Sequence, residues 1–440
     1  MMRQVMTGNK HALDLYLGKN NLIGRLILSP DDQLFWQYNE RWQQTGFAIS
    51  PHLPIDNDIP SVNVHRFLRN LLPEGNGLDE LVAHFHQLSK NNTFGLMLAL
   101  GLDAPGALIM LAFGQTYPTE GKFLAISDTD LEKRLNVREE NGLIVWHGKP
   151  RLSVAGVQDK INVVVNEEGQ LGFGEGSLCS THILKFEKKK LSHLVLNEYI
   201  TLQLAKQCGL NVTQAKLMRF GKNPALLIKR FDRQYVSINE VMRRPVIDGC
   251  QALNLSPEYK YERNFGSSRD VAHIRDGASF QKLFSFANQC ANPALTKQQM
   301  LDWALFNLMV FNYDAHGKNI TFFVSEHGLS LAPFYDLVNV RMYPNFEQEM
   351  AMALGDEFDG NTVNAYQLAD FADTCHTSRS IVAKRLKLIA NRLILGLQKE
   401  MNLIVGDGEE IHYMQRYQLM VMERCGHLLS QSDEILSIEL

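Results

Sequence analysis

The stretch Phe311–Phe323, "FNYDAHGKNITFF", carries an acid, a base, an ammonium and an amide within six residues. These are Asp314, His316, Lys318 and Asn319, and apolar residues stand before and after them. The preceding segment has the apolar spacing of a helix, and the following one is typical of a strand. We therefore expect a short, rigid loop between two buried elements, which could hold polar groups in fixed positions for chemistry.

The spacing of Asp314 and Asn319, D-x-x-x-x-N, is the one found in the catalytic loops of protein kinases. There the aspartate accepts the proton of the substrate hydroxyl and the asparagine holds magnesium. Asp336 ends the run "APFYD", where a hairpin would bring a second magnesium carboxylate back to Asn319. The alternative is a capped turn in which Asp314 and Asn319 satisfy backbone groups, and the spacing alone favours that alternative.

A lysine upstream has the context that kinase chemistry requires. Lys185 lies in the strand-like run "THILKF", flanked by apolar residues. Because an ammonium is costly to bury without an anion, ATP phosphates are a suitable partner. Glu198, on the helix that follows, is a candidate for the lysine–glutamate pair of kinases, and a solvated helix face is the alternative interpretation.

Two segments compete as the cradle for phosphate groups. The first is the Gly-rich string "GFGEGS", Gly172–Ser177, which is also typical of a plain hairpin connection. The second is Arg151–Val165, whose small residues, Ser153 and Gly156 among them, let backbone amides approach an anion, while Lys160 adds charge. The residue pattern does not choose between them.

Composition and charge exclude several classes of protein. With 440 residues, 45% hydrophobic and 21% charged, the chain can bury a large core and should form two or three subdomains. The formal net charge of −4 argues against nucleic-acid binding by overall charge, so any DNA contact would need a partner. The six cysteines are scattered without a C-x-x-C pair, which predicts neither zinc nor disulfides and fits a reducing cytoplasm.

The apolar segment 94–114 approaches the length of a membrane span, but Asp103 and Pro105 interrupt it. An aspartate in the middle of a bilayer is costly. We therefore predict a buried helix, a turn and a buried strand here, and no membrane association. The first residues also lack the pattern of a signal peptide.

The hydropathy pattern divides the chain into three expected domains, 1–125, 126–246 and 247–440. The first begins with a predicted hairpin over 12–37 and continues with helical spacing. The second shows two strands, a helix ending at Gly209 and more strands, an order found in small nucleotide-binding lobes. The third is mainly helical and is interrupted by a single hairpin.

Seven motifs together resemble one known family. In chain order they are "SVAGVQDK", "THILKF", "NEYITLQLAKQCGLNV", "LIKRFDR", "CQALNL" with "KYE", "DAHGKN" and "PFYD". Their order and spacing, from Ser153 to Asp336, are similar to those of HipA-like serine/threonine kinases, the toxins of HipBA toxin–antitoxin modules. The resemblance extends more loosely to "FLRNLLPEG" and "GALIML". It implies an α+β, two-lobed protein-kinase-like fold with an extra N-terminal subdomain and a mainly helical C-terminal lobe.

The resemblance also implies a nucleotide site. Ser153 matches the serine that the family autophosphorylates, and the residues after it match the loop that grips ATP phosphates, which favours 151–165 over "GFGEGS". Phosphorylated Ser153 would expel this loop and limit the activity. The ATP-binding residues implied are Val154, Ala155, Gly156, Val157, Gln158, Lys160, Lys185, Lys229, Phe231, Gln251 and Tyr335.

The catalytic residues implied are Asp314 as the base, with His316 and Lys318 as its supports, and Asn319 and Asp336 as magnesium ligands. Some patterns depart from familiar ones. The "HRD" of ordinary kinases is "NYD" here and "DFG" is "DLV", so their activation-segment rules do not carry over. Within "DAHGKN", Gly and Ala are exchanged around the histidine relative to the family, and Gly317 would give the loop a different backbone preference.

The function implied is transfer of the γ-phosphate of ATP, with Mg²⁺, to a serine or threonine hydroxyl. The family's substrate class, aminoacyl-tRNA synthetases, implies growth arrest and persistence. The partners implied are a HipB-like helix-turn-helix antitoxin and, through the antitoxin complex, operator DNA. Lys384, Arg385 and Lys387 are candidate DNA contacts, although an amphipathic helix with a solvated basic face explains them as simply.

Two other functions fit the same residues. The chain could be a catalytically idle kinase fold that acts as a corepressor with a DNA-binding antitoxin. It could also be a metal-dependent phosphohydrolase in which Asp314 and His316 serve a bound water. The presence of Lys185, Asp314, Asn319 and Asp336 together argues against an idle fold.

Overall fold

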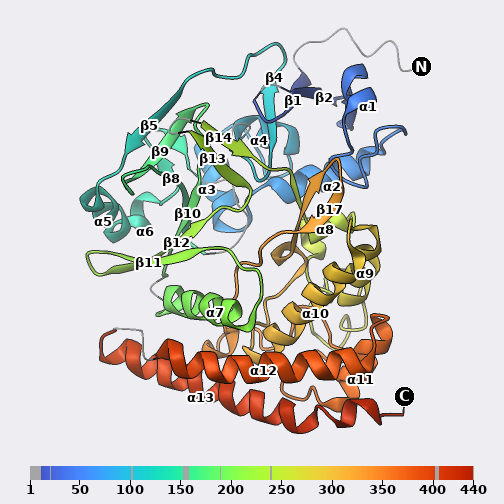
Figure 1. Cartoon of the computed structure of the whole chain (residues 1–440). Coiled ribbons are helices and arrows are strands. Elements are labelled where there is room, and N and C mark those ends of the chain that lie inside the picture. The colour runs from blue at the N-terminus through green and yellow to red at the C-terminus, as the bar shows by residue number, and fades with distance from the viewer. Residues whose placement is uncertain are drawn as a thin grey trace. The chain divides into compact units, whose positions relative to one another are not determined.

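The computed structural model describes residues 11–19, 21–100, 103–151, 158–188, 190–237, 240–401 and 406–439. The chain forms two compact units, and Figure 1 labels their elements. Unit 1 contains Met1–Glu187, Lys216–Ile247 and Phe322–His327. Unit 2 contains Lys188–Ala215, Asp248–Thr321 and Gly328–Leu440. The described part of the chain has no helix long and apolar enough to cross a membrane.

Unit 1 begins with an antiparallel sheet of four strands in the order β3-β2-β1-β4. The strands are β1 (Ala12–Leu17), β2 (Asn21–Leu28), β3 (Leu34–Tyr38) and β4 (Leu108–Ala112). The predicted hairpin over 12–37 is confirmed by β1 and β2. The accompanying helices are α1 (Glu40–Thr45), α2 (Ser61–Leu71), α3 (Asn76–His84) and α4 (Thr93–Leu100). The predicted helix, turn and strand within 94–114 are α4 and β4, both largely buried.

A second sheet in unit 1 has six strands in the order β11-β12-β10-β8-β9-β5. They are β5 (Gly121–Ala125), β8 (Lys160–Val165), β9 (Leu171–Gly176), β10 (His182–Phe186), β11 (Ala215–Phe220) and β12 (Asn223–Lys229). Helix α5 (Asp128–Asn136), which Ser127 caps, is followed by α6 (Arg138–Asn141). Leu131 of α5 packs in one apolar core with alternate strand residues such as Ile161 and Leu184. The residues between them, which include Lys160 and Lys185, therefore face the other side of the sheet.

The string "GFGEGS" is strand β9 and not a connection between strands. A Cβ added at Gly174 would come 2.0 Å from the backbone oxygen of Leu178, and one at Gly172 would come 2.3 Å from the ring of Phe123. These glycines are therefore needed because neighbouring segments approach closely. The alternative of a plain hairpin connection is wrong.

Two small hairpins complete the strands of unit 1, namely β6 (Val145–Trp146) with β7 (Lys149–Pro150), and β13 (Arg233–Ser237) with β14 (Glu240–Arg243). A buried ionic cluster lies at the start of β13. Arg230 donates to both carboxylate oxygens of Asp232 at 3.0 and 2.8 Å, and Arg233 donates to one of them at 2.8 Å. Burial disfavours the charged carboxylate, but the two guanidinium groups outweigh that cost and hold the pKa of Asp232 below its usual range.

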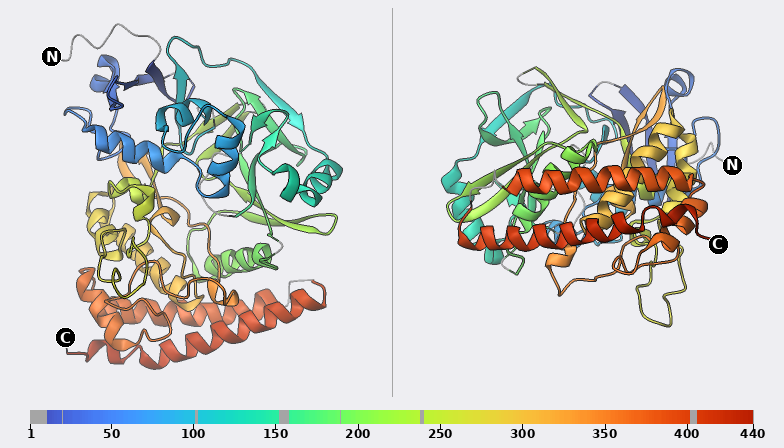
Figure 2. Two further views of the ribbon diagram at one scale, coloured as in Figure 1. Left: turned by 180° about the vertical axis from the view of Figure 1, so that it is seen from behind. Right: turned by 60° about the horizontal axis from the view of Figure 1, so that its bottom comes forward.

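Unit 2 is mainly helical. Its helices are α7 (Leu194–Cys208), α8 (Gly249–Ala252), α9 (Phe280–Phe286), α10 (Pro293–Met309), α11 (Ala365–Thr374), α12 (Arg379–Met401) and α13 (Gly408–Gln431). The predicted end of α7 is confirmed, because Gly209 has the left-handed φ of 90° that favours glycine. Figures 1 and 2 show α12 and α13 side by side, and α12 also contacts α7 and α10.

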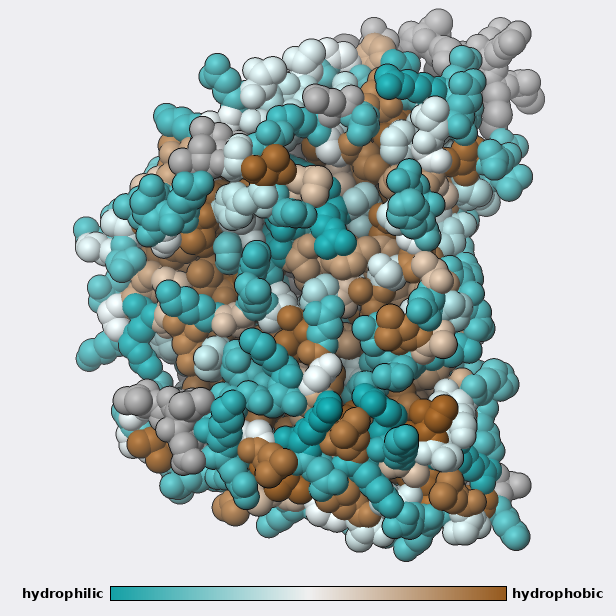
Figure 3. All heavy atoms as spheres, viewed as in Figure 1, coloured by the Kyte–Doolittle hydropathy of each residue, from teal (hydrophilic) through white to brown (hydrophobic). Residues whose placement is uncertain are grey.

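Three short strands lie where the chain passes between the units, and they are β15 (Val246–Asp248), β16 (Thr321–Ser325) and β17 (Gly328–Leu331). The amide of Ala332 donates to the carbonyl of Thr321 at 2.8 Å, which closes the predicted hairpin. All six cysteines are buried, and none of them forms a disulfide bond. On the face in Figure 3, hydrophilic and apolar side chains are interspersed, including over α12 and α13.

Candidate active site

The loop that carries Asp314 follows α10, whose apolar residues are buried on nearly every side. Phe311 takes a left-handed φ of 56°, which turns the chain out of the helix. The side chain of Asp314 is exposed, whereas His316, Lys318 and Asn319 are 6%, 7% and 5% exposed. The predicted loop between two buried elements is therefore present. Asp314 is exposed on this loop, whereas its other three polar side chains are buried.

Hydrogen bonds inside the loop fix its shape. The side-chain amide nitrogen of Asn319 donates to the carbonyl of Asp314 at 2.8 Å, and the amide of His316 donates to the same carbonyl at 2.9 Å. The amide of Lys318 donates to Nδ1 of His316 at 3.2 Å. Asn319 thus satisfies a backbone group, as the capped-turn alternative predicts, while its amide oxygen keeps the chemistry of a metal ligand.

Lys318 is part of a buried ion pair. Its Nζ lies 2.8 Å from Oδ2 of Asp248, and the two side chains are 5% and 14% exposed. Asp248 also caps helix α8 in a reciprocal capping box with Gln251. The lysine therefore joins the loop from Asp314 to Asn319 to the start of α8. Gln251, which is 4% exposed, therefore has a structural role as the partner of Asp248 in this capping box.

Tyr335 and Asp336 lie in the segment after the hairpin, whose returning strand β17 ends at Leu331. The hydroxyl of Tyr335 donates to the carbonyl of Lys318 at 2.6 Å and lies 2.8 Å from the hydroxyl of Thr321. Burial, with the nearby carboxylates of Asp248 and Asp336, raises the pKa of Tyr335 well above its ordinary value. Asp336 itself has a left-handed φ of 56°. The residues after the hairpin are thus brought back to the loop that holds Asn319.

Gly317 is required by packing and not by its backbone angle, which is not left-handed. A Cβ at this position would come 2.6 Å from Cβ of Ala278 and 3.1 Å from Sγ of Cys250. The predicted difference in backbone preference from the Gly and Ala exchange stays a prediction. Because Gly317 has no Cβ, the loop can lie close to the segments that carry Ala278 and Cys250.

Tyr261 lies within the motif "KYE", and the sequence predicted no role for it. Its hydroxyl donates to Oδ1 of Asp314 at 2.7 Å. The two residues are 53 positions apart in the chain, so no spacing rule links them. The order of the family motifs does not indicate this contact either.

In unit 1, Lys185 stands directly opposite Lys160 in the pairing of β10 with β8, and each lysine is 6% exposed. Gln158, which is partly buried, donates to the carbonyl of Phe186 at 3.4 Å. Two of the predicted phosphate contacts, Lys160 and Lys185, therefore lie on one face of the sheet, and their role stays a prediction.

The other predicted nucleotide residues of unit 1 lie at the end of β12 and after it. Lys229 is exposed at the last position of β12, and the ring of Phe231 meets that of Phe323 edge-to-face at 5.9 Å. Residues 152–157, which include Ser153, Val154, Ala155, Gly156 and Val157, lie outside the described residues. Their predicted roles stay predictions.

Glu198 lies on α7 in unit 2 and is fully buried. The alternative of a solvated helix face is therefore wrong. The same helix holds Asn197, which donates to the carbonyl of Asn339 at 3.0 Å and to the hydroxyl of Tyr413 at 2.7 Å. Asn197 and Glu198 are thus buried polar positions of α7, whereas Lys206 and Gln207 near its end are exposed.

The basic cluster on α12 makes ion pairs. Arg385 donates to both carboxylate oxygens of Asp302 on α10, at 2.6 and 2.5 Å. Lys387 pairs with Asp433, and Lys384 is exposed. Two of the three candidate DNA contacts are therefore engaged with carboxylates of the chain itself.

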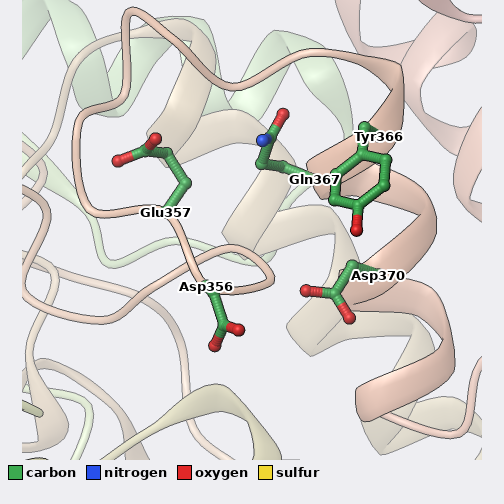
Figure 4. A pocket seen from close by; sticks show the side chains of 5 residues that line it. All are labelled: Asp356, Glu357, Tyr366, Gln367 and Asp370. Carbon is green, nitrogen blue, oxygen red and sulfur yellow. The ribbon is translucent and has the colours of Figure 1, made fainter. Parts of the chain in front are cut away.

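A separate pocket of about 290 Å³ in unit 2 has an acidic lining, shown in Figure 4. Its side chains come from the start of α11 and from the loop before it, and they are Asp356, Glu357, Tyr366, Gln367 and Asp370. Over the described ranges, no three His, Cys, Asp or Glu side chains are grouped so that they could hold a metal ion. The carboxylate of Asp356 pairs with Arg275 at 2.7 Å.

The antiparallel sheet with two opposed buried lysines, and the helical unit with a hydrogen-bonded D-x-x-x-x-N loop, define an α+β protein of the protein-kinase-like class. A family model described as HipA N-terminal domain matches residues 13–111, and one described as HipA-like C-terminal domain matches residues 152–398. The chain belongs to the HipA family, as its motifs predicted.

Relatives and a solved structure agree with this assignment. The chain is 43% identical, over 99% of its length and 100% of the relative's, to "Serine/threonine-protein kinase toxin HipA" of Shewanella oneidensis. It is 29% identical to "Putative kinase Y4mE" of Sinorhizobium fredii, over 83% of this chain and 86% of the relative. A solved Shewanella oneidensis complex of HipA, HipB and operator DNA contains a chain that matches with a TM-score of 0.90 and 43% identity, covering 97% of this chain and 100% of that one. The predicted fold class is confirmed.

Proposed function

We propose that this chain is the serine/threonine protein kinase toxin of a type II toxin–antitoxin module and transfers the γ-phosphate of ATP to a protein hydroxyl. The observation that carries the proposal is the 43% identity, over the full length, to a relative named as a serine/threonine kinase toxin. The hydrogen-bonded loop from Asp314 to Asn319 supports it, because a kinase needs an exposed acid on a rigid loop.

In the proposed reaction, the exposed carboxylate of Asp314 accepts a hydrogen bond from the substrate hydroxyl and orients its oxygen toward the phosphoryl group. His316 and Lys318 stabilise the conformation of this loop. His316 does so through the contact of its Nδ1 with the amide of Lys318, and Lys318 through its ion pair with Asp248. The proton of the hydroxyl passes to Asp314 as the new phosphate ester forms.

Asn319 and Asp336 would hold magnesium. An amide oxygen and a carboxylate are donors that this ion prefers, and Mg²⁺ commonly takes only one or two protein ligands beside water and phosphate oxygens. The residues present therefore fit the ion, although they supply fewer carboxylates than an all-protein metal site. When bound, magnesium neutralises charge on the phosphate groups.

Unit 1 would bind the nucleotide. Lys160 and Lys185 stand opposite each other in the pairing of β8 with β10, and their ammonium groups would contact the phosphate groups. Residues 154–158 would place backbone amides around the phosphates. The backbone around Lys229 and Phe231 would hold adenine, and Gln251 and Tyr335 are further proposed contacts of the nucleotide.

Regulation and partners complete the proposal. Phosphorylation of Ser153 would add a double negative charge to a loop that grips phosphates, and the activity would thereby limit itself. A HipB-like antitoxin would bind the chain and carry it to operator DNA, as in the Shewanella complex. The substrate would be an aminoacyl-tRNA synthetase in the cytoplasm, and its modification would arrest growth.

The test compares the native chain with Asp314→Asn after incubation with Mg²⁺ and radiolabelled ATP. Phosphate on Ser153 and on a synthetase substrate, found by peptide mass spectrometry for the native chain alone, is the expected result. ATP consumption without protein-bound phosphate would favour a phosphohydrolase instead. If the native chain and the variant label proteins equally, the proposed reaction is wrong.

A corepressor function is the second candidate, because the matching solved chain lies in a complex with HipB and operator DNA. It predicts that Asp314→Asn represses its operon as well as the native chain does. A reporter gene behind the operator separates the two activities. Full repression by a variant that transfers no phosphate would show that the two functions are independent.

A further inference from the structure

We propose that Tyr261 is a positioning residue for phosphoryl transfer, which holds the carboxylate of Asp314 in the orientation that accepts the substrate hydroxyl. The inference rests on the proposed kinase function and deepens it. It starts from the 2.7 Å hydrogen bond that the hydroxyl of Tyr261 donates to Oδ1 of Asp314. Among the described residues, this is the side-chain hydrogen bond that the Asp314 carboxylate accepts.

A carboxylate on an exposed aspartate needs such a contact to keep one orientation. The terminal torsion of aspartate is broad and roughly two-fold, so the two oxygens exchange places easily. The loop hydrogen bonds fix the backbone of Asp314 and leave this torsion free. A donor at Oδ1 removes that freedom and leaves Oδ2 for the substrate hydroxyl.

The segment that carries Tyr261 is fastened to the catalytic loop on both sides. The carbonyl of Lys260 accepts from the amide of Gly317 at 2.9 Å, and the amide of Glu262 donates to the carbonyl of Ala351 at 2.9 Å. The amide of Ala351 in turn donates to the carbonyl of Tyr313 at 2.7 Å. The residues before and after Tyr261 are therefore tied, directly or through one link, to the neighbours of Asp314.

Glu262 fixes the segment further. Its side chain is nearly buried, with 3% of the residue exposed, and lies 2.5 Å from the guanidinium of Arg275. Its second oxygen accepts from the amide of Ala353 at 2.9 Å. A residue beside such an anchor presents its own side chain reproducibly, which is what a positioning contact requires.

The ring of Tyr261 is also held in place. Its plane meets that of His316 edge-to-face, with 5.2 Å between centroids, and the ammonium of Lys260 lies 5.3 Å from the ring centroid. The residue is still 37% exposed, so the hydroxyl stays at the surface where a protein substrate would arrive. Tyr261 exchanges no proton with the substrate, and its effect passes through Asp314.

The first experiment measures kcat and the KM for ATP of the full-length Tyr261→Phe variant, which keeps the ring and removes the donor. Rates are taken per nucleotide-binding site, so that unfolded molecules do not lower kcat. We expect kcat to fall about tenfold with little change in KM, because one hydrogen bond to a charged group at an exposed site is lost. The matched control, Tyr259→Phe, changes a neighbouring tyrosine and should leave both constants unchanged.

The second experiment repeats Tyr261→Phe in the Asp314→Asn background. If Tyr261 acts through Asp314, the double variant is no slower than Asp314→Asn alone. A tenfold loss in both backgrounds, or a native kcat for Tyr261→Phe, would overturn the inference. Equal rates for the native chain and Asp314→Asn would instead refute the proposed reaction, so the two failures are distinguishable.

Discussion

Two buried lysines of this molecule lie in different parts of the fold. Lys318 in unit 2 lies 2.8 Å from the carboxylate of Asp248, whereas Lys185 in unit 1 stands opposite another lysine, Lys160, in the register of the sheet. The first arrangement fastens the loop to α8. The second brings two largely buried lysines onto one face of the sheet. We therefore expect Lys318 to act in the scaffold, whereas the proposed nucleotide site makes Lys185 a candidate phosphate contact.

The largest expected effect comes from breaking the scaffold lysine. Lys318→Met leaves the largely buried carboxylate of Asp248 without its partner, and we expect the free energy of unfolding to fall by about 3 kcal/mol. Denaturant titration measures it. The control Lys384→Met, at an exposed position of α12, should change stability by less than about 0.5 kcal/mol. An equal loss for both variants would contradict a structural role for Lys318.

A second variant asks whether packing, in addition to charge, holds the loop. Gly317→Ala places a methyl group 2.6 Å from Cβ of Ala278, so we expect a loss of about 2 kcal/mol in unfolding free energy. Gly426→Ala, in α13, is the control because its added Cβ meets nothing within 4 Å, and it should stabilise the chain by up to about 1 kcal/mol. Thermal unfolding distinguishes them, and a stabilised Gly317→Ala would show that the site is less tightly packed.

Lys185 is expected to act on nucleotide binding. Lys185→Met removes a proposed phosphate contact, so we expect ATP affinity to fall about tenfold. Calorimetric titration with ATP and with adenosine is the measurement, and adenosine binding should be unchanged. The exposed Lys122, replaced in the same way, should affect neither. Lower stability with native ATP affinity would reverse the assignment.

The smallest effect concerns pH in unit 1. Burial and the neighbouring Lys229 lower the pKa of His182 to about 4, below its unfolded value near 6.5. The unfolded chain therefore takes up this proton first, and stability is fully present above pH 6.5 and declines as the pH falls toward 4. We expect about 1 kcal/mol to be lost between pH 7 and 5.5. His182→Gln should remove this part of the slope, whereas His327→Gln, at an exposed position, should not.

Local patterns in the sequence predicted many elements, and contacts between distant residues were not predictable. The strand of Lys185, the end of α7 at Gly209 and the loop of Asp314 follow from apolar spacing and turn residues. The contact of Lys318 with Asp248 joins residues 70 positions apart, and no periodicity encodes it. The burial of Glu198 was equally hidden. Polar residues such as Lys206 of the same helix are exposed, so the polarity of Glu198 does not reveal its burial.

The close approach of Gly317 to Ala278 has a consequence for how these positions change together in related sequences. The two residues share one small volume, which holds a single methyl group. Chains of the family that carry alanine at the position of Gly317 should therefore carry glycine at the position of Ala278. A paired substitution of this kind would be visible as covariation between two sites 39 residues apart.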